Sequence, residues 1–215
     1  MSQVALSFDN GPHPEATSRV LDVLQRYGVL ATFFVIGKNV AARDGPTLIG
    51  RARAQGHWIG NHTYSHTMPL GRIADPAVAI AEIEMTQALI GNCAEERRLF
   101  RPYGEGGNLD NRLLGQAVIR HLQDRRYDCV IWNVVPGDWL EPDGWVETAL
   151  ARIEATPQAL VVLHDIPAAS PAKLPEFIER CLDCGHSISQ DFPASCVLIR
   201  DGAIVQPLDH LTPEG

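Results

Sequence analysis

Long hydrophobic runs are missing from this sequence. No apolar stretch approaches the roughly 20 residues that a membrane-spanning helix needs. The opening residues MSQVALSFD also lack the basic segment followed by an apolar one that marks a secretory signal. We therefore expect a cytoplasmic protein as the sequence stands, and an exported one if a leader precedes it. Repeats, low-complexity tracts and linker-like stretches are absent too, so we expect residues 1–215 to form one domain.

Positive charge is scarce. The chain has 18 Lys and Arg against 26 Asp and Glu, which gives a formal net charge of -8. Because contacts to phosphate need clustered Lys and Arg, this balance argues against a general nucleic-acid binder and favours a neutral or cationic substrate. The composition, 45% hydrophobic and 20% charged, is that of an ordinary globular chain and excludes a disordered, collagen-like or coiled-coil protein.

A second cysteine pair is also lacking. Cys181 and Cys184 form a CxxC followed by His186, but a structural zinc site would need another matched pair, and Cys196 alone is poor support for one. We therefore interpret the CxxC as the end of a helix with half-buried thiols. The five cysteines, an odd number without a signal peptide, indicate reduced thiols.

The chain does contain an alternation of short apolar strands and amphipathic helices. The patterns predict strands at 4–8, 31–37, 58–59, 99–100, 127–135 and 159–164, helices at 14–27, 46–55, 76–90, 110–126, 143–155 and 174–184, and a closing hairpin at 196–206. This order indicates an α/β domain with parallel strands, a barrel or a curled sheet whose chemistry lies at the carboxyl ends of the strands.

Side chains suited to catalysis follow five of these strands. Asp9 and Asn10 end the first strand, and His62 and His66 follow the third. On a helix, two histidines at i and i+4 share one face and could bind a divalent ion, for which Asp9 or Asn10 could supply a third, oxygen ligand. The other three strand ends carry Arg101, Asp138 with Trp139, and His164 with Asp165. Metal-assisted hydrolysis of an amide or ester needs such a set, because it uses a metal ion, a carboxylate base and an imidazolium acid.

Five segments of the chain resemble the motifs of a known family. SFDNGP, HTYSH, FRPYG, GDW and VVLHD, which span residues 7–165 in this order, are similar to the five motifs of the NodB-type polysaccharide deacetylases, carbohydrate esterase family 4. The resemblance implies a distorted (β/α) barrel of about seven strands with an open metal site at its C-terminal face. It also implies removal of acetyl groups from N-acetylglucosamine units of an oligo- or polysaccharide, or from acetylated xylan as in some members.

The same resemblance assigns a role to each of these side chains. It makes Asp9 the general base and His164 the general acid. Arg101 would orient the base, and Asp138 would pair with His164. It implies that the backbone N–H of Tyr103 stabilises the oxyanion and that Trp139 and Val162 line the pocket for the acetyl group. Of the other three tryptophans, Trp58 and Trp132 are expected in the core.

The resemblance also implies a divalent metal, zinc by preference, held by Asn10, His62 and His66. The family usually has an aspartate at the position of Asn10. An asparagine binds only through a neutral carbonyl oxygen, so one negative charge opposite the ion is lost and we expect weaker metal binding. Two other departures are FRPYG, one residue shorter than the usual FRPPYG, and Val135, where the family usually has an aspartate.

These departures leave two alternatives to the deacetylase open. One is a related hydrolase of C–N bonds in cyclic amides, which shares the fold and acts with little or no metal. The other is an inactive homologue that only binds carbohydrate. Asp9, Arg101, Asp138 and His164 count against a pure binding protein, because binding alone does not need a matched acid and base.

Overall fold

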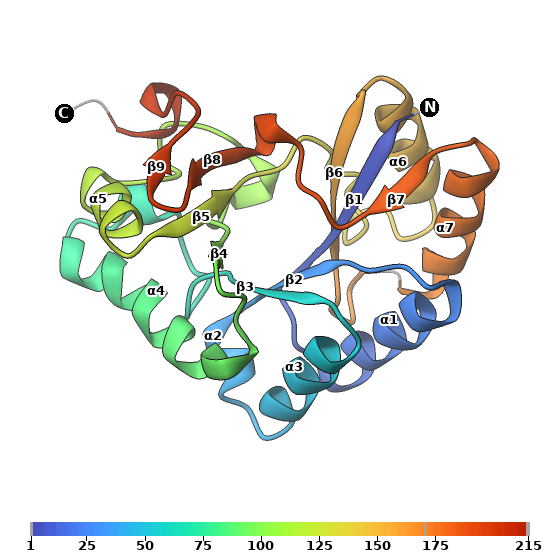
Figure 1. Cartoon of the computed structure of the whole chain (residues 1–215), viewed down its shortest axis with the longest axis horizontal. Helices are drawn as coiled ribbons and strands as arrows, with labels where there is room; N and C mark the ends of the chain where they lie inside the picture. The colour runs from blue at the N-terminus through green and yellow to red at the C-terminus, as the bar shows by residue number, and fades with distance from the viewer. Residues whose placement is uncertain (1, 170, 214–215) are drawn as a thin grey trace.

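A curled sheet of nine strands forms the centre of the molecule, and helices surround its outer side (Figure 1). This computed structural model describes residues 2–169 and 171–213. The strands are β1 (Gln3–Asp9), β2 (Thr32–Val35), β3 (Trp58–Asn61), β4 (Arg98–Phe100), β5 (Tyr127–Val130), β6 (Gln158–His164), β7 (Ser187–Ser189), β8 (Val197–Arg200) and β9 (Ala203–Ile204). Their order is β6-β1-β2-β3-β4-β5-β8-β9, with β7 paired to β1, and all pairs are parallel except β5–β8 and β8–β9.

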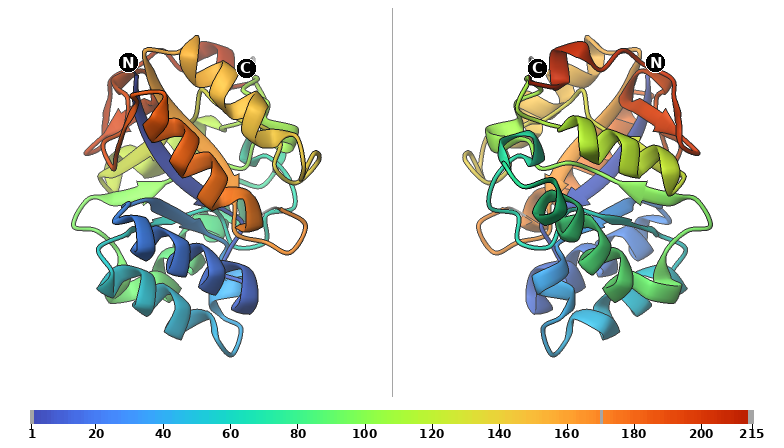
Figure 2. Two further views of the ribbon diagram at one scale, coloured as in Figure 1. Left: turned by 90° about the vertical axis from the view of Figure 1, so that its right-hand side faces the viewer. Right: turned by 90° about the vertical axis from the view of Figure 1, so that its left-hand side faces the viewer.

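The helices cover the sheet from two sides. They are α1 (Pro14–Tyr27), α2 (Gly37–Val40), α3 (Gly45–Ala54), α4 (Pro76–Ile90), α5 (Gln116–Asp124), α6 (Trp145–Glu154) and α7 (Leu174–Asp183). Figure 2 shows α1, α6 and α7 along one side of the molecule, and α4 and α5 along the opposite side. Because each strand and the following helix alternate along the chain, the carboxyl ends of the parallel strands meet at one edge of the sheet.

The alternation of side chains along β1 separates the core from the interior of the curled sheet. Val4, Leu6 and Phe8 pack outward in one buried cluster with α1, α6 and α7. Ala5 belongs to a second cluster with Leu160 and Val162 of β6. Since strand residues alternate between the two faces, Ser7 and Asp9 share the inner face with Ala5. The last residue of β1 therefore presents a carboxylate at the inner edge of the sheet.

The chain beyond β5 closes the parallel part of the sheet, which runs from β6 to β5. Val134 forms an isolated parallel bridge with Val161 of β6. Its N–H donates to the carbonyl of Leu160 at 3.2 Å, and its carbonyl accepts from the N–H of Val162 at 2.9 Å. This contact draws the segment after β5 towards β6, as expected for a distorted barrel. The predicted fold class is confirmed.

Most of the predicted elements are present, with two corrections. The predicted helix 110–126 is wrong at its start, since α5 begins only at Gln116, and the predicted strand 127–135 ends at Val130. The two histidines at i and i+4 lie in an irregular loop instead of on a helix. In that loop Thr63 and His66 have positive φ angles of 65° and 52°, which a right-handed helix excludes.

Across the described ranges 2–169 and 171–213, no helix combines the length and the apolar character needed to cross a membrane. The longest helix, α4, runs for 15 residues.

Candidate active site

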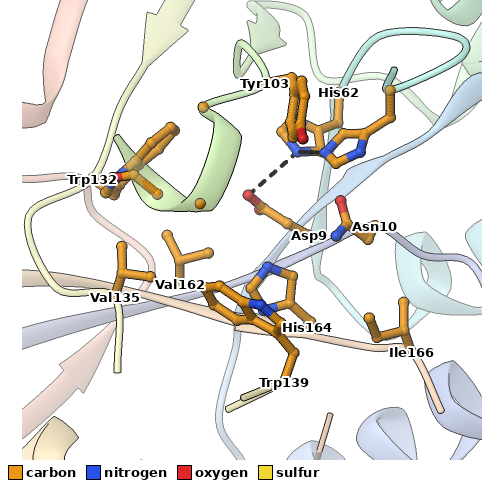
Figure 3. Close-up of a pocket in the computed structure, with 14 residues that line it drawn as sticks. Asp9, Asn10, His62, Tyr103, Trp132, Val135, Trp139, Val162, His164 and Ile166 are labelled. Atoms are coloured by element: carbon orange, nitrogen blue, oxygen red, sulfur yellow. Dashed lines mark hydrogen bonds and ion pairs between the residues drawn. The ribbon is translucent and has the colours of Figure 1, made fainter. Parts of the chain in front are cut away.

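A cavity of about 190 Å³ opens at the carboxyl ends of the parallel strands (Figure 3). Its walls come from the ends of β1 and β6 and from the loops that follow β3, β4 and β5. Eight of the ten predicted site residues line it: Asp9, Asn10, His62, His66, Tyr103, Trp139, Val162 and His164. The other two, Arg101 and Asp138, lie behind the wall and bond to residues that line it. The structure therefore brings all ten together.

Asp9 is held from behind by a buried arginine. The Arg101 guanidinium donates from Nη1 to Asp9 Oδ1 at 2.8 Å and to the Ser7 hydroxyl at 2.7 Å. It lies 4.0 Å from the centroid of the Phe34 ring and is fully buried. Burial lowers the pKa of Arg101, while the adjacent Asp9 carboxylate opposes that shift. Since Oδ1 is occupied by Arg101, Oδ2 is the oxygen that faces the cavity, 3.6 Å from His62 Nε2.

His164 is fixed by a carboxylate through two contacts. Asp138 Oδ1 lies 2.8 Å from His164 Nδ1, and Asp138 Oδ2 accepts from the His164 backbone N–H at 2.8 Å. A carboxylate only accepts, so Nδ1 carries a proton and Nε2 is the ring atom left for the cavity. Burial pulls the pKa of His164 down, but the hydrogen bond and the charge of Asp138 outweigh it, so the pKa is raised. The Trp139 ring packs edge-on against the imidazole, with centroids 4.5 Å apart.

The two loop histidines meet although they are not on a helix. His62 Nδ1 lies 2.9 Å from the carbonyl of Arg101, to which it can only donate, so the lone pair of His62 is on Nε2. His66 Nε2 lies 3.1 Å from that atom. Burial lowers the pKa of His62 to about 3, and burial together with neighbouring His62 lowers the pKa of His66 to about 2. Both rings are therefore neutral near pH 7, as metal ligands must be.

Asn10 supplies a third neutral donor at the same place. Its Oδ1 is buried and accepts no hydrogen bond from any described residue. Figure 3 shows the Asn10 amide beside the carboxylate of Asp9. Asn10 has a φ of 76°, a conformation that asparagine adopts more readily than most residues. The orphaned amide oxygen and the paired imidazoles are the kind of donor set that a divalent ion takes.

The spacing of the His62 and His66 imidazoles suits two ligands of one metal ion. Two nitrogen ligands of a tetrahedral zinc ion lie roughly 3.3 Å apart when each Zn–N bond is about 2.0–2.1 Å. The observed separation of the two Nε2 atoms is 3.1 Å. Within residues 2–169 and 171–213, no cluster of three His, Cys, Asp or Glu side chains is suited to a metal. The third donor at this site, the Asn10 amide oxygen, belongs to none of these residue types. The residues present thus fit a weakly held divalent ion.

The remaining predicted residues form walls of the cavity. The Tyr103 ring packs against His66 at a tilt of 50°, with centroids 4.0 Å apart. Val162 is an inward residue of β6, 3% exposed, close to the end of that strand. Together with Trp139 it provides an apolar surface beside His164.

Some residues of the cavity were missed by the sequence analysis. Trp132, expected in the core, is 6% exposed but lines the cavity, and its Nε1 donates to the carbonyl of Gly107 at 3.1 Å. Val135 and Ile166 line it as well. Ser7, which accepts a hydrogen bond from Arg101, was also not singled out. The available signal was Gly104, where a Cβ atom would overlap the Trp132 ring.

Comparisons with known proteins agree with the geometry. The sequence model of the family described as "Polysaccharide deacetylase" matches residues 2–118. A chitooligosaccharide deacetylase of Rhizobium leguminosarum bv. trifolii is 37% identical over 166 residues, which covers 75% of this chain and 71% of that protein. A solved structure described as "T48 deacetylase with substrate" superimposes with a TM-score of 0.72 at 31% identity, covering 87% of each chain.

A further solved structure carries a metal. The family 4 acetyl xylan esterase from Clostridium thermocellum, in complex with a cobalt ion, superimposes with a TM-score of 0.69 at 28% identity, covering 87% of each chain. The family match, the curated relative and both structures agree with the resemblance found in the five motifs. The chain therefore belongs to the polysaccharide deacetylase family and is a hydrolase of amide bonds.

Proposed function

We propose that this chain, as one domain over residues 1–215, removes acetyl groups from N-acetylated sugars, with Asp9 as general base and His164 as general acid. The substrate class is N-acetylglucosamine units of chitooligosaccharide or peptidoglycan type. The observation that carries the proposal is the placement of Asp9 and His164. They are register partners at the ends of two neighbouring parallel strands, and each is anchored by a second residue outside the cavity.

The base acts through the free oxygen of Asp9. Arg101 occupies Oδ1 and fixes the carboxylate plane, so Oδ2 is available to take a proton from the water that attacks the acetyl carbonyl carbon. The oxygen of that water forms the new C–O bond of acetate. The developing negative charge on the carbonyl oxygen would be met by the backbone N–H of Tyr103.

The acid acts from the other side of the cavity. His164 Nε2–H would protonate the amide nitrogen as the C–N bond breaks, so the sugar leaves as an amine and acetate remains. Asp138 keeps the ring oriented and raises the pKa of His164, which keeps the imidazolium populated close to neutral pH. The proton taken by Asp9 and the proton given by His164 balance the reaction. Trp139 and Val162 would hold the acetyl methyl group.

His62, His66 and Asn10 would hold the divalent ion, which we propose to be zinc. When bound, such an ion polarises the acetyl carbonyl and lowers the pKa of water. The neutral imidazoles, the 3.1 Å between their Nε2 atoms and the unpartnered Asn10 oxygen support this set of ligands.

Asn10 also favours a second candidate function. A site of three neutral ligands holds a divalent ion less tightly than one that includes a carboxylate, because one Coulomb attraction is lost. A related hydrolase of cyclic amides, which uses the same base and acid with little or no metal, is therefore the alternative. Dependence of the activity on metal separates the two candidates.

The test is acetate release from N-acetylchitooligosaccharides, measured with added zinc and again with a strong chelator. Release that needs zinc supports the metal-dependent deacetylase. Release that the chelator leaves unchanged supports the base and acid but removes the metal from the proposal. No release under either condition overturns the proposed substrate class and favours the cyclic-amide hydrolase.

A further inference from the structure

The loop between the two histidines has all its backbone polar groups paired. This histidine loop, residues 63–65, has three N–H groups and three carbonyls. The N–H of Thr63 donates to Asn61 Oδ1 at 3.0 Å. The carbonyls of Thr63 and Tyr64 accept from the backbone N–H groups of Gly37 and Lys38 at 2.9 and 3.0 Å. The three groups that remain are satisfied by two charged side chains from other elements.

One of these side chains is Glu82 of α4. Its Oε2 accepts from the N–H of Tyr64 at 2.9 Å and from the N–H of Ser65 at 2.7 Å. The other is Lys38, whose Nζ donates to the carbonyl of Ser65 at 2.9 Å. In the part of the chain that the structure describes, Glu82 makes no ion pair. Its half-buried carboxylate is therefore directed to the histidine loop alone.

The backbone of this region requires such an anchor. Thr63 and His66, which bracket Tyr64 and Ser65, have φ angles of 65° and 52°. Residues other than glycine adopt the left-handed region only when the surrounding structure holds them there. The N–H groups that Glu82 accepts from lie directly between these two positions, and Ser65 is bonded covalently to His66.

We propose that Glu82 is the positioning residue of the metal-ligand loop, and that its two hydrogen bonds hold His66 Nε2 against His62 Nε2. The inference rests on the proposed function insofar as the two imidazoles hold an ion. Loss of the carboxylate leaves two N–H groups without an acceptor, so the loop relaxes from its left-handed residues and the two ring nitrogens separate. Residues that orient metal ligands in this way typically change metal affinity about 10- to 100-fold when replaced.

Three variants test the proposal. Glu82→Ala removes the oxygen that accepts both hydrogen bonds, whereas Glu82→Gln keeps a neutral acceptor oxygen in its place. Glu84→Ala is the matched control, because Glu84 lies on the same helix but faces His121 and Arg125 instead of the histidine loop. Thermal unfolding of each variant confirms that it folds, and Glu82→Gln serves in place of Glu82→Ala if the latter does not.

The first readout needs no metal. Hydrogen exchange of the Tyr64 and Ser65 amides and the ring resonances of His66 are followed by nuclear magnetic resonance in the metal-free protein. We expect faster exchange and shifted His66 resonances in Glu82→Ala, smaller changes in Glu82→Gln and none in Glu84→Ala. Amides and ring resonances that do not change in Glu82→Ala overturn the proposal.

The second readout is the zinc affinity of the same proteins, measured by calorimetric titration with zinc alone. A 10- to 100-fold weakening in Glu82→Ala, part of it restored in Glu82→Gln, supports the proposal. Faster amide exchange with unchanged zinc affinity contradicts it, since the hydrogen bonds would then stabilise the loop without positioning a ligand. If the unaltered protein binds no zinc, the proposed metal dependence is wrong. The positioning role of Glu82 is then tested by the His66 resonances of the metal-free proteins alone.

Discussion

Asp9 and His164 occupy the same register position at the ends of the neighbouring parallel strands β1 and β6. Each is fixed by a partner from another part of the chain, Asp9 by Arg101 directly after β4 and His164 by Asp138 in the loop after β5. A base and an acid placed in this way face one reaction volume from two sides, as Figure 3 shows for their side chains. The sheet itself thus sets the distance between the two proton-transfer groups.

Asp138→Asn should move the pH dependence of the reaction. Asp138 raises the pKa of His164 above its usual value, so the imidazolium needed as acid is present below that pKa and lost as the pH rises through it. Without the carboxylate, burial remains and lowers the pKa. We expect the falling, high-pH limb of the kcat profile to shift to lower pH, and kcat near pH 7 to drop by roughly 10²-fold or more. An unshifted limb would show that another group is the acid.

Asn10→Asp should strengthen zinc binding. The substitution restores an anionic oxygen beside two neutral imidazoles, and we expect an affinity gain of at least about tenfold, which corresponds to about 1.4 kcal/mol. A calorimetric titration of the purified protein with zinc measures the change. Equal affinities of the two proteins would mean that residue 10 does not face the ion.

His57 should make the protein less stable in mild acid. This histidine is 1% exposed, and burial lowers its pKa from 6.5 to about 4. Below pH 6.5 the unfolded chain binds a proton that the folded chain does not, so stability falls as the pH is lowered from 6.5 towards 4. The shift in the pKa of His57 corresponds to a loss of up to about 3 kcal/mol in the free energy of unfolding.

The measurement is the free energy of unfolding in urea at several pH values for the unaltered protein and His57→Asn. The difference in free energy of unfolding between the two proteins should change with pH only between pH 6.5 and about 4. His210→Asn, at an exposed position, is the control and should leave the pH dependence unchanged. Because buried His62 and His66 also have lowered pKa values, a smaller pH dependence remains in His57→Asn. Equal pH dependences of the unaltered protein and His57→Asn would contradict the assignment.

Gly11→Ala should destabilise the turn that carries Asp9 and Asn10. A Cβ atom at this position would overlap the carboxyl group of Asp165, which is 1% exposed and accepts from the Thr17 hydroxyl at 2.5 Å. We expect a loss of about 1–3 kcal/mol in the free energy of unfolding. Asp165→Ala removes the overlapping atoms, so a double-mutant cycle should show that the two losses are not additive. Strict additivity would show that the two residues do not meet.

Local signals in the sequence were sufficient to predict several elements. Helices α1 and α4 have the bounds predicted for them, Pro14–Tyr27 and Pro76–Ile90. Both have a proline in the first turn, and α1 ends at Gly28 with a φ of 64°, the left-handed residue that such a helix end requires. The predicted hairpin is confirmed as β8 and β9 with its turn at Asp201–Gly202.

Other features depend on contacts that the sequence does not display. Leu113 and Leu114 have the spacing of an apolar helical stripe. They are buried, but they lie in the loop that precedes α5. His62 and His66 would share one face if their segment were helical, but the segment is a loop. There the rings meet because Thr63 and His66 have positive φ angles and because Asn61 and Glu82 accept hydrogen bonds from the loop backbone. In both cases tertiary contacts replace the local pattern. Asp9, Arg101 and His164 could be placed from the sequence because they lie at or directly after the ends of parallel strands, which converge at one edge of the sheet.

The most direct test of the account is to compare turnover with binding in Asp9→Asn and His164→Ala. Acetate release from N-acetylchitooligosaccharides in the presence of zinc is measured beside the binding of the same substrate by calorimetry, with the exposed His210→Ala as control. The account predicts that each site variant loses roughly 10²- to 10⁴-fold in turnover while it still binds the sugar, and that the control loses nothing. Turnover that persists in both site variants would contradict the assignment of Asp9 and His164 as base and acid.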